Sequence, residues 1–167
     1  MKGERIIVVD EKDNVVGVES RVLVDEKKLR YRVSALWLKN SGGDVLLARR
    51  AFSKTHYPGR WGPAVAGTVD EGESYEDNIV KEAGEELGLV GVDMKEGPKV
   101  EISGKYNHFT QWFVGVVDED VDFFKIQEEE VAEVKWFSVG ELKDMIMDHP
   151  EMFVKSLVEL PGELIKT

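Results

Sequence analysis

The sequence predicts an α+β fold, an α/β/α sandwich in which a mixed β-sheet lies between helices. Short apolar runs of strand length alternate with turn residues along most of the chain, whereas few segments have helical periodicity. The 167 residues fit one domain, 1–167, because domains usually contain roughly 100–200 residues. A core of this size buries about two-thirds of the unfolded surface, so the fold needs no covalent cross-link.

Each expected strand is an apolar run bounded by turn residues. The turn-rich segment 11–14 separates the first two runs and predicts an N-terminal hairpin over about 5–24. Asn40-Ser-Gly-Gly43 predicts a second hairpin, and a loop is expected at 50–62. The expected strands are 5–10, 15–18, 32–39, 44–49, 63–69, 99–106, 111–117 and 133–137.

One long helix is expected at 74–87. Ser74 followed by Asp77 resembles a capping box, and Gly88 supplies a stop signal. Apolar residues recur every fourth position and predict a stripe that faces the core; they are Tyr75, Ile79, Ala83 and Leu87. Two further helices, at 138–147 and 150–160, would place the C-terminal helices at about 138–160.

The composition limits the kinds of partner. Acidic residues outnumber basic ones by 33 to 22, and the net charge of −11 opposes binding to nucleic acid. The absence of cysteine excludes disulfides, thiolate zinc sites and a cysteine nucleophile, and it fits a cytoplasmic location. Because the sequence has neither a signal peptide nor a membrane span, we expect no membrane partner.

Part of the negative charge is concentrated on the expected helix 74–87. Glu82, Glu85 and Glu86 stand at i, i+3 and i+4, so their side chains share one face. A solvated acidic face is the common alternative. The opposite stripe is apolar, however, and the glycine-rich chain before the helix permits a close backbone approach. Clustered carboxylates suit Mg²⁺ or Mn²⁺, and such ions activate water and neutralise charge on phosphate.

The same segment resembles the Nudix box, G-x5-E-x7-R-E-U-x-E-E-x-G-U, where U is aliphatic. Gly67-Thr-Val-Asp-Glu-Gly-Glu73 and Lys81-Glu-Ala-Gly-Glu-Glu-Leu-Gly-Leu89 match every fixed position of the box at 67–89 except its arginine, here Lys81. Lysine lacks the bidentate fork of arginine, which leaves the positioning of Glu82 open. The resemblance implies a Nudix-type fold and a hydrolase that cleaves diphosphate bonds.

The resemblance also implies roles for individual residues. The metal ligands would be Glu82, Glu85, Glu86 and the backbone carbonyl of Ala66. Glu82 and Glu86 would be catalytic, with Glu82 acting as the base that activates water or helping to orient it. Gly67, Glu73 and Lys81 would support the loop and the glutamates.

The segments Leu46–Lys54 and Tyr57–Trp61 are similar to isopentenyl-diphosphate isomerase, itself a Nudix-fold enzyme. That likeness implies that Arg50 and Lys54 bind the substrate diphosphate, although solvated surface cations are the alternative. The isomerase chemistry is not retained. Ala66 occupies the place of the essential cysteine. Metal-binding histidines of the isomerase are replaced by Tyr31 and Thr68, and two of its glutamates are replaced by Tyr106 and His108.

Several other residues are weaker candidates. Nudix hydrolases often place a further metal-binding or basic glutamate in the region of Glu128 and Glu130, although acidic runs are usually solvated loops. His56 and His108 are candidates for lining a pocket. Three aromatic residues are candidates for stacking on a base or holding an apolar tail; they are Trp61, Trp112 and Phe113. Packing in the core is the alternative for two of the three.

The sequence therefore predicts metal-dependent hydrolysis of a diphosphate bond in a small molecule, and the expected substrate is a nucleoside diphosphate linked to another moiety. An isomerase-like enzyme and a binding module without turnover are the alternatives. The three intact glutamates disfavour a pure binder, and the substrate and the oligomeric state, including a homodimer, are left open.

Overall fold

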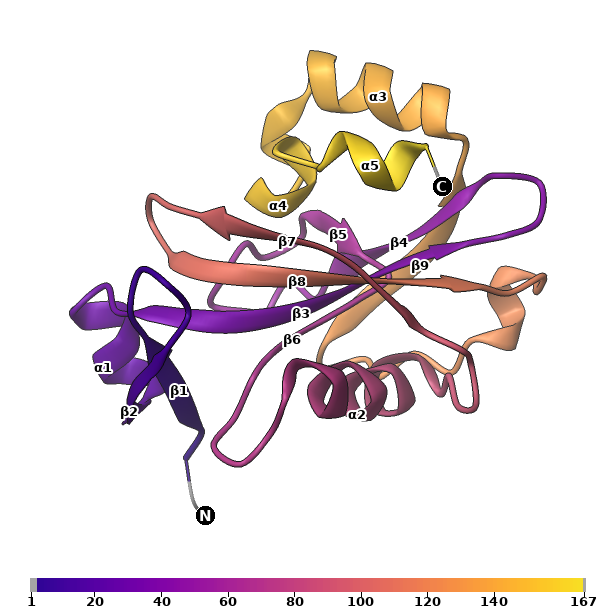
Figure 1. Cartoon of the computed structure of the whole chain (residues 1–167). Coiled ribbons are helices and arrows are strands. Elements are labelled where there is room, and N and C mark those ends of the chain that lie inside the picture. Colours follow the sequence, from indigo (N-terminus) through magenta and orange to yellow (C-terminus); the bar gives the residue numbers. More distant parts are fainter. Residues whose placement is uncertain (1–2, 167) are drawn as a thin grey trace.

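The computed structural model describes residues 3–166, in which nine strands form one mixed sheet (Figure 1). Residues 1–2 and 167 of the expected domain lie outside the described residues. The strands are β1 Arg5–Val9, β2 Val15–Ser20, β3 Arg30–Lys39, β4 Val45–Arg50, β5 Trp61–Pro63, β6 Val65–Thr68, β7 Lys95–Ile102, β8 Asn107–Val116 and β9 Val131–Phe137. The helices are α1 Arg21–Glu26, α2 Tyr75–Leu87, α3 Val139–Asp148, α4 Lys155–Val158 and α5 Gly162–Ile165, with 3₁₀ turns η1 at Val121–Phe123 and η2 at Pro150–Met152.

Strand β3 is the centre of the sheet. It pairs antiparallel with β1, β4 and β6 and parallel with β8. Its side chains alternate between two cores, because Leu36 and Leu38 join the cluster with α2, whereas Ala35 and Trp37 join the cluster with α3, α4 and α5. Helices thus cover both faces of the sheet (Figure 1), which confirms the predicted α/β/α sandwich.

Helix α2 follows its sequence signals closely. Ser74 Oγ accepts from Asp77 N at 3.0 Å, and the Asp77 side chain accepts from Ser74 N at 3.1 Å, so the capping box is present. Gly88 ends the helix in the left-handed conformation, with φ 66°. Ile79, Ala83 and Leu87 are buried against the sheet. The predicted core-facing stripe therefore fixes the direction of the opposite, acidic face.

The structure corrects the predicted N-terminal half at three places. The hairpin ends at Ser20 rather than near residue 24, because Ser20 Oγ accepts from Leu23 N and caps helix α1. The expected loop 50–62 ends in strand β5, which pairs with β4 from Leu47 to Arg49. Strand β6 covers only residues 65–68 of the expected strand 63–69.

Strands β7 and β8 begin four residues earlier than predicted. A β-bulge at residues 97–98 interrupts the alternation of β7 and conceals its first residues. Between the strands, Gly104 has a φ of 140° and donates to the side chain of Asn107, which makes a turn inside the expected strand 99–106.

The prediction of one helix over 150–160 was wrong. Pro150 begins a 3₁₀ turn, and Phe153 is extended, with its bridge to Trp61 and the hydrogen bond from Val154 N to Trp61 O joining this segment to β5. The short helices α4 and α5 follow, separated by Pro161. In the described part of the chain, no helix is long and apolar enough to span a membrane.

Candidate functional site

A cavity of about 740 Å³ opens between α2, strand β6, the loop 51–60 and helix α1. Most of the site residues that the sequence predicts line this cavity, whereas Glu73 lies behind it and Glu128 is exposed and outside it. The predicted residues on the lining are Arg50, Lys54, Ala66, Gly67, Lys81, Glu82, Glu85, Glu86 and Glu130.

Gly67 lets the acidic helix approach strand β6. A Cβ atom at Gly67 would lie 2.4 Å from Glu82 Cγ and 2.9 Å from Asn78 Oδ1, so any other residue would displace these two side chains. Asn78 is fully buried and donates to Thr68 O at 3.0 Å. Sequence reasoning missed Asn78, although its place on the inner face of the helix was visible. Together these contacts place Ala66 and Glu82 at one wall of the cavity.

Glu82 and Glu86 form a carboxyl pair in which Glu86 is buried and Glu82 is partly buried. Burial raises the pKa of Glu82 to about 7, and burial together with the Glu82 and Glu130 carboxylates raises the pKa of Glu86 well above its ordinary value. The two carboxyl groups interact, and their raised pKa values favour the protonated forms when no cation is bound. Glu85 and Glu86 also occupy the last turn of α2, where the helix dipole opposes negative charge. Stability alone does not favour this arrangement.

Lys81 pairs mainly with Glu73 and only distantly with Glu82. Its Nζ lies 2.7 Å from Glu73 Oε2, 3.5 Å from Asp70 Oδ2 and 3.8 Å from Glu82 Oε1. Glu73 also accepts from Asp70 N at 2.9 Å and from Asn78 Nδ2 at 3.3 Å. The Lys81–Glu73 pair therefore ties the loop before α2 to the helix.

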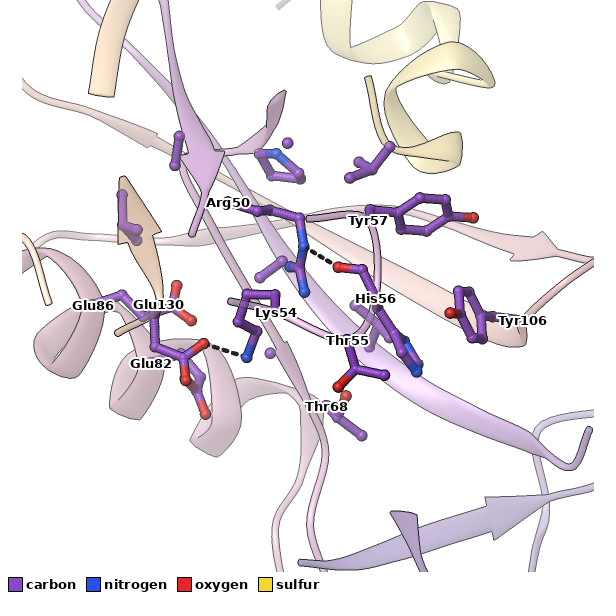
Figure 2. A pocket seen from close by; sticks show the side chains of 18 of the residues that line it. Arg50, Lys54, Thr55, His56, Tyr57, Thr68, Glu82, Glu86, Tyr106 and Glu130 are labelled. Atoms are coloured by element: carbon purple, nitrogen blue, oxygen red, sulfur yellow. Dashed lines mark hydrogen bonds and ion pairs between the residues drawn. The ribbon is translucent and has the colours of Figure 1, made fainter. Parts of the chain in front are cut away.

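Arg50 and Lys54 face the carboxylates from the opposite wall (Figure 2). Arg50 is largely buried, and its Nε donates to His56 O at 2.8 Å; burial lowers the pKa of its guanidinium, while Glu86 and Glu130 act in the opposite direction. Lys54 Nζ donates to Glu130 Oε2 at 2.6 Å. Partly buried cations opposite these carboxylates can hold an anionic group between them.

The other end of the cavity is polar and aromatic, and Figure 2 shows His56, Tyr57 and Tyr106 there, away from Glu82 and Glu86. All the positions at which the chain departs from the isomerase pattern line the cavity; they are Tyr31, Ala66, Thr68, Tyr106 and His108. Sequence reasoning missed Arg21 and Asp25 of α1, which join them. Arg21 Nη2 donates to Thr68 Oγ1 at 2.6 Å, and no sequence signal marked either residue.

The remaining candidates divide between cavity and core. His56 and His108 both line the cavity, and burial lowers the pKa of His108 to about 4, so this imidazole is neutral at neutral pH. Trp61, Trp112 and Phe113 are all buried in the core and none lines the cavity. Over residues 3–166, no three histidine or carboxylate side chains already converge on one point as metal ligands do.

Comparisons with known proteins agree with this architecture. The NUDIX domain family model matches residues 28–155. An uncharacterized Nudix hydrolase of Pseudomonas aeruginosa is 33% identical over 136 residues, which cover 80% of this chain and 78% of that protein. An isopentenyl-diphosphate Delta-isomerase of Kocuria rhizophila is 33% identical over 159 residues, which cover 90% of this chain and 86% of that protein.

Solved structures show the same fold. DR0079 from Deinococcus radiodurans superimposes with a TM-score of 0.79 at 27% identity, over 94% of this chain and 96% of that one. The MutT protein of Methanosarcina mazei has a TM-score of 0.65 at 19% identity, over 82% and 91% of the two chains, and this likeness concerns the fold alone.

Proposed function

The chain belongs to the Nudix family and is a Nudix hydrolase, and from this premise we propose that it hydrolyses a diphosphate bond in a small molecule, with Mg²⁺ as its cofactor. The substrate we favour is a nucleoside diphosphate linked to another group. The observation that carries the proposal is the Glu82–Glu86 pair, of which Glu86 is buried, opposite the largely buried guanidinium of Arg50.

The donor set fits a hard divalent cation. Two adjacent carboxyl groups with raised pKa values are held together against their repulsion, and a cation between them would replace the protons that they take up. Glu82, Glu85, Glu86 and the Ala66 carbonyl would hold Mg²⁺, and the same oxygen ligands accept Mn²⁺. Glu130 faces Glu86 and is a further candidate ligand, whereas the exposed Glu128 is not retained.

The chain's own residues would divide the work across the cavity. A bound cation lowers the pKa of water and neutralises charge on phosphate oxygens. Glu82 or Glu86 would accept the proton of the attacking water, because both carboxyl groups line the cavity and have raised pKa values. Within residues 3–166 no protein atom accepts from the Nη groups of Arg50, which leaves them for phosphate oxygens. Lys54 would give up its hydrogen bond to Glu130 and donate to the same phosphate instead.

Isomerisation is the second candidate, because named isomerases are 26–33% identical over 90% of the chain. We disfavour it because protonating an alkene needs acids that this cavity lacks at the matching positions. Ala66 has no titratable group, His108 is neutral and buried, and burial raises the pKa of Tyr31 to about 12. Hydrolysis needs only the carboxylate face, which is complete.

A substrate screen tests the proposed function. Pure protein would be given nucleotide sugars, dinucleotides, nucleoside triphosphates and isoprenoid diphosphates with Mg²⁺ or Mn²⁺, and release of phosphate or nucleotide would be measured. We expect metal-dependent release from at least one nucleotide class and none from the Glu86→Gln variant. Folded protein that binds a nucleotide but releases nothing from any class would favour the binding module instead.

A further inference from the structure

Helix α1 lies before the part of the chain that the family model matches, yet it contributes to the cavity. Its Asp25 Oδ2 lies 2.9 Å from His56 Nε2, and His56 belongs to the loop 51–60 that follows Arg50 and carries Lys54. An element outside the matched region therefore contacts, through a side chain, the loop that follows Arg50 and carries Lys54.

The imidazole of His56 is held on a second side by an aromatic ring. It stacks on Tyr106 with ring centroids 3.7 Å apart and planes at 15°. Tyr57 meets the edge of the same Tyr106 ring at 5.5 Å and 80°. The His56 ring is thus fixed at its edge by a carboxylate and across its face by a tyrosine.

The backbone of His56 in turn holds Arg50. The His56 carbonyl accepts from Arg50 Nε at 2.8 Å (Figure 2), so any movement of His56 moves the guanidinium. The loop also contains Tyr57 with a φ of 48° and Gly59 with a φ of 70°. Left-handed backbone at a tyrosine persists only where surrounding contacts impose it. This loop therefore needs anchors, and the ring of His56 is one.

We infer that Asp25 and His56 are positioning residues that fix the loop 51–60 and, through the His56 carbonyl, the Arg50 guanidinium. The inference rests on the proposed function only for Arg50 as a phosphate ligand. The groups that face His56 are Asp25 and Arg21 from α1, Arg50 from β4, Tyr106 from the turn between β7 and β8, and His108 from β8. A neutral imidazole that donates from Nε2 to the Asp25 carboxylate satisfies this arrangement.

Binding of methylenediphosphonate, a diphosphate analogue that resists hydrolysis, tests the effect on Arg50. In calorimetry with saturating Mg²⁺, we expect Asp25→Ala to weaken binding about tenfold, because small displacements of a clamp are costly. Asp25→Asn should bind within about twofold of wild type, because its amide oxygen accepts from the same Nε2 proton. Glu26→Ala is the matched control, since Glu26 is the exposed neighbour of Asp25 in α1.

A double-mutant cycle tests whether the two residues act as one unit. His56→Ala should weaken binding as much as Asp25→Ala, and the double variant should be no weaker than either single one. Additive losses, or wild-type binding by Asp25→Ala, would overturn the inference.

Hydrogen exchange separates this inference from the proposed function. We expect the amides of residues 51–60 to exchange faster in Asp25→Ala than in Asp25→Asn or Glu26→Ala. Unchanged exchange in Asp25→Ala overturns the inference whatever the probe does. If wild-type protein does not bind the probe but exchange responds as expected, the phosphate-binding role of Arg50 fails while the anchoring by Asp25 and His56 stands.

Discussion

The two ends of the cavity are built in different ways. The carboxylate end consists of Glu82, Glu85 and Glu86 from one continuous helix, joined by Glu130. The aromatic end is assembled from five separate parts of the chain; its residues are Arg21, Asp25, Tyr31, His56, Thr68, Tyr106 and His108. A helix carries its spacing in the sequence, whereas an assembled wall depends on how distant segments meet.

The two ends also differ in charge. At the first end, burial and neighbouring carboxylates raise the pKa values of Glu82 and Glu86. At the second end, Asp25 lies 2.9 Å from His56 Nε2 and 3.8 Å from Arg21 Nη1, although within residues 3–166 neither Asp25 Oδ1 nor Arg21 Nη1 has a hydrogen-bond partner. An arrangement that costs stability without a ligand indicates a reacting end, and a carboxylate placed between two basic side chains indicates a recognising and positioning end.

The largest expected effect is on the carboxylate end. Glu86→Gln should lower kcat/KM by at least about a hundredfold, because even residues that only support metal ligands often contribute 10- to 100-fold. Stability should hold or rise, since one of two repelling buried carboxyl groups is removed. Steady-state kinetics on the substrate from the screen, with thermal unfolding, would measure both. Near wild-type rates would show that this face does not bind the metal; Glu76→Gln, exposed on the same helix, is the control.

A smaller loss is expected at the cations between the two ends. Arg50→Ala should lower kcat/KM by roughly ten- to a hundredfold, and Lys54→Ala by less, because arginine makes paired hydrogen bonds to phosphate. A loss in KM would indicate equal binding of ground and transition states, and a loss in kcat would indicate stabilisation of the leaving group. Changes within twofold in both variants would remove the phosphate clamp; Lys12→Ala, exposed in the first turn, serves as a surface control.

The pH dependence of stability sharpens the electrostatic contrast. The folded-state pKa of Glu82 is about 7 against an ordinary value of 4.5, and that of Glu86 is also raised, so the folded protein binds more protons than the unfolded chain. Their contribution is therefore present below pH 4.5 and is lost as the pH rises toward 7. With a chelator present, Glu86→Gln should become increasingly more stable than wild type across this window. Denaturant unfolding at several pH values measures the difference in the free energy of unfolding between variant and wild type. A difference that does not grow with pH would contradict the raised pKa of Glu86.

The smallest expected effect is an absence of change. The aromatic end lacks the acids of an isomerase, so pure protein should not exchange deuterium from D₂O into the allylic carbons of isopentenyl diphosphate at any metal concentration. Mass spectrometry of the recovered substrate would detect exchange, with a known isomerase as the positive control. Exchange catalysed by this chain would mean that the substituted positions retain isomerase chemistry.

Local signals in the sequence determined helix α2 and its acidic face. Its ends follow from three residues, Ser74, Asp77 and Gly88. The recurrence of apolar residues at every fourth position set its orientation, because a helix repeats every 3.6 residues wherever it lies. The resemblance to the Nudix box added Gly67, and the structure gives its physical reason in the close approach of Glu82. The strands that are bounded by clear turn residues were predicted from local signals of the same kind.

Only the tertiary structure decided what faces that helix. Asp25 and His56 are 31 residues apart and meet because α1 packs beside the sheet, and no local pattern encodes that contact. The C-terminal segment 150–160 has helical periodicity, yet its bridge to Trp61 draws Phe153 and Val154 into the core as extended chain. Periodicity describes a segment's own preference, whereas long-range hydrogen bonds and burial depend on partners that the segment does not contain.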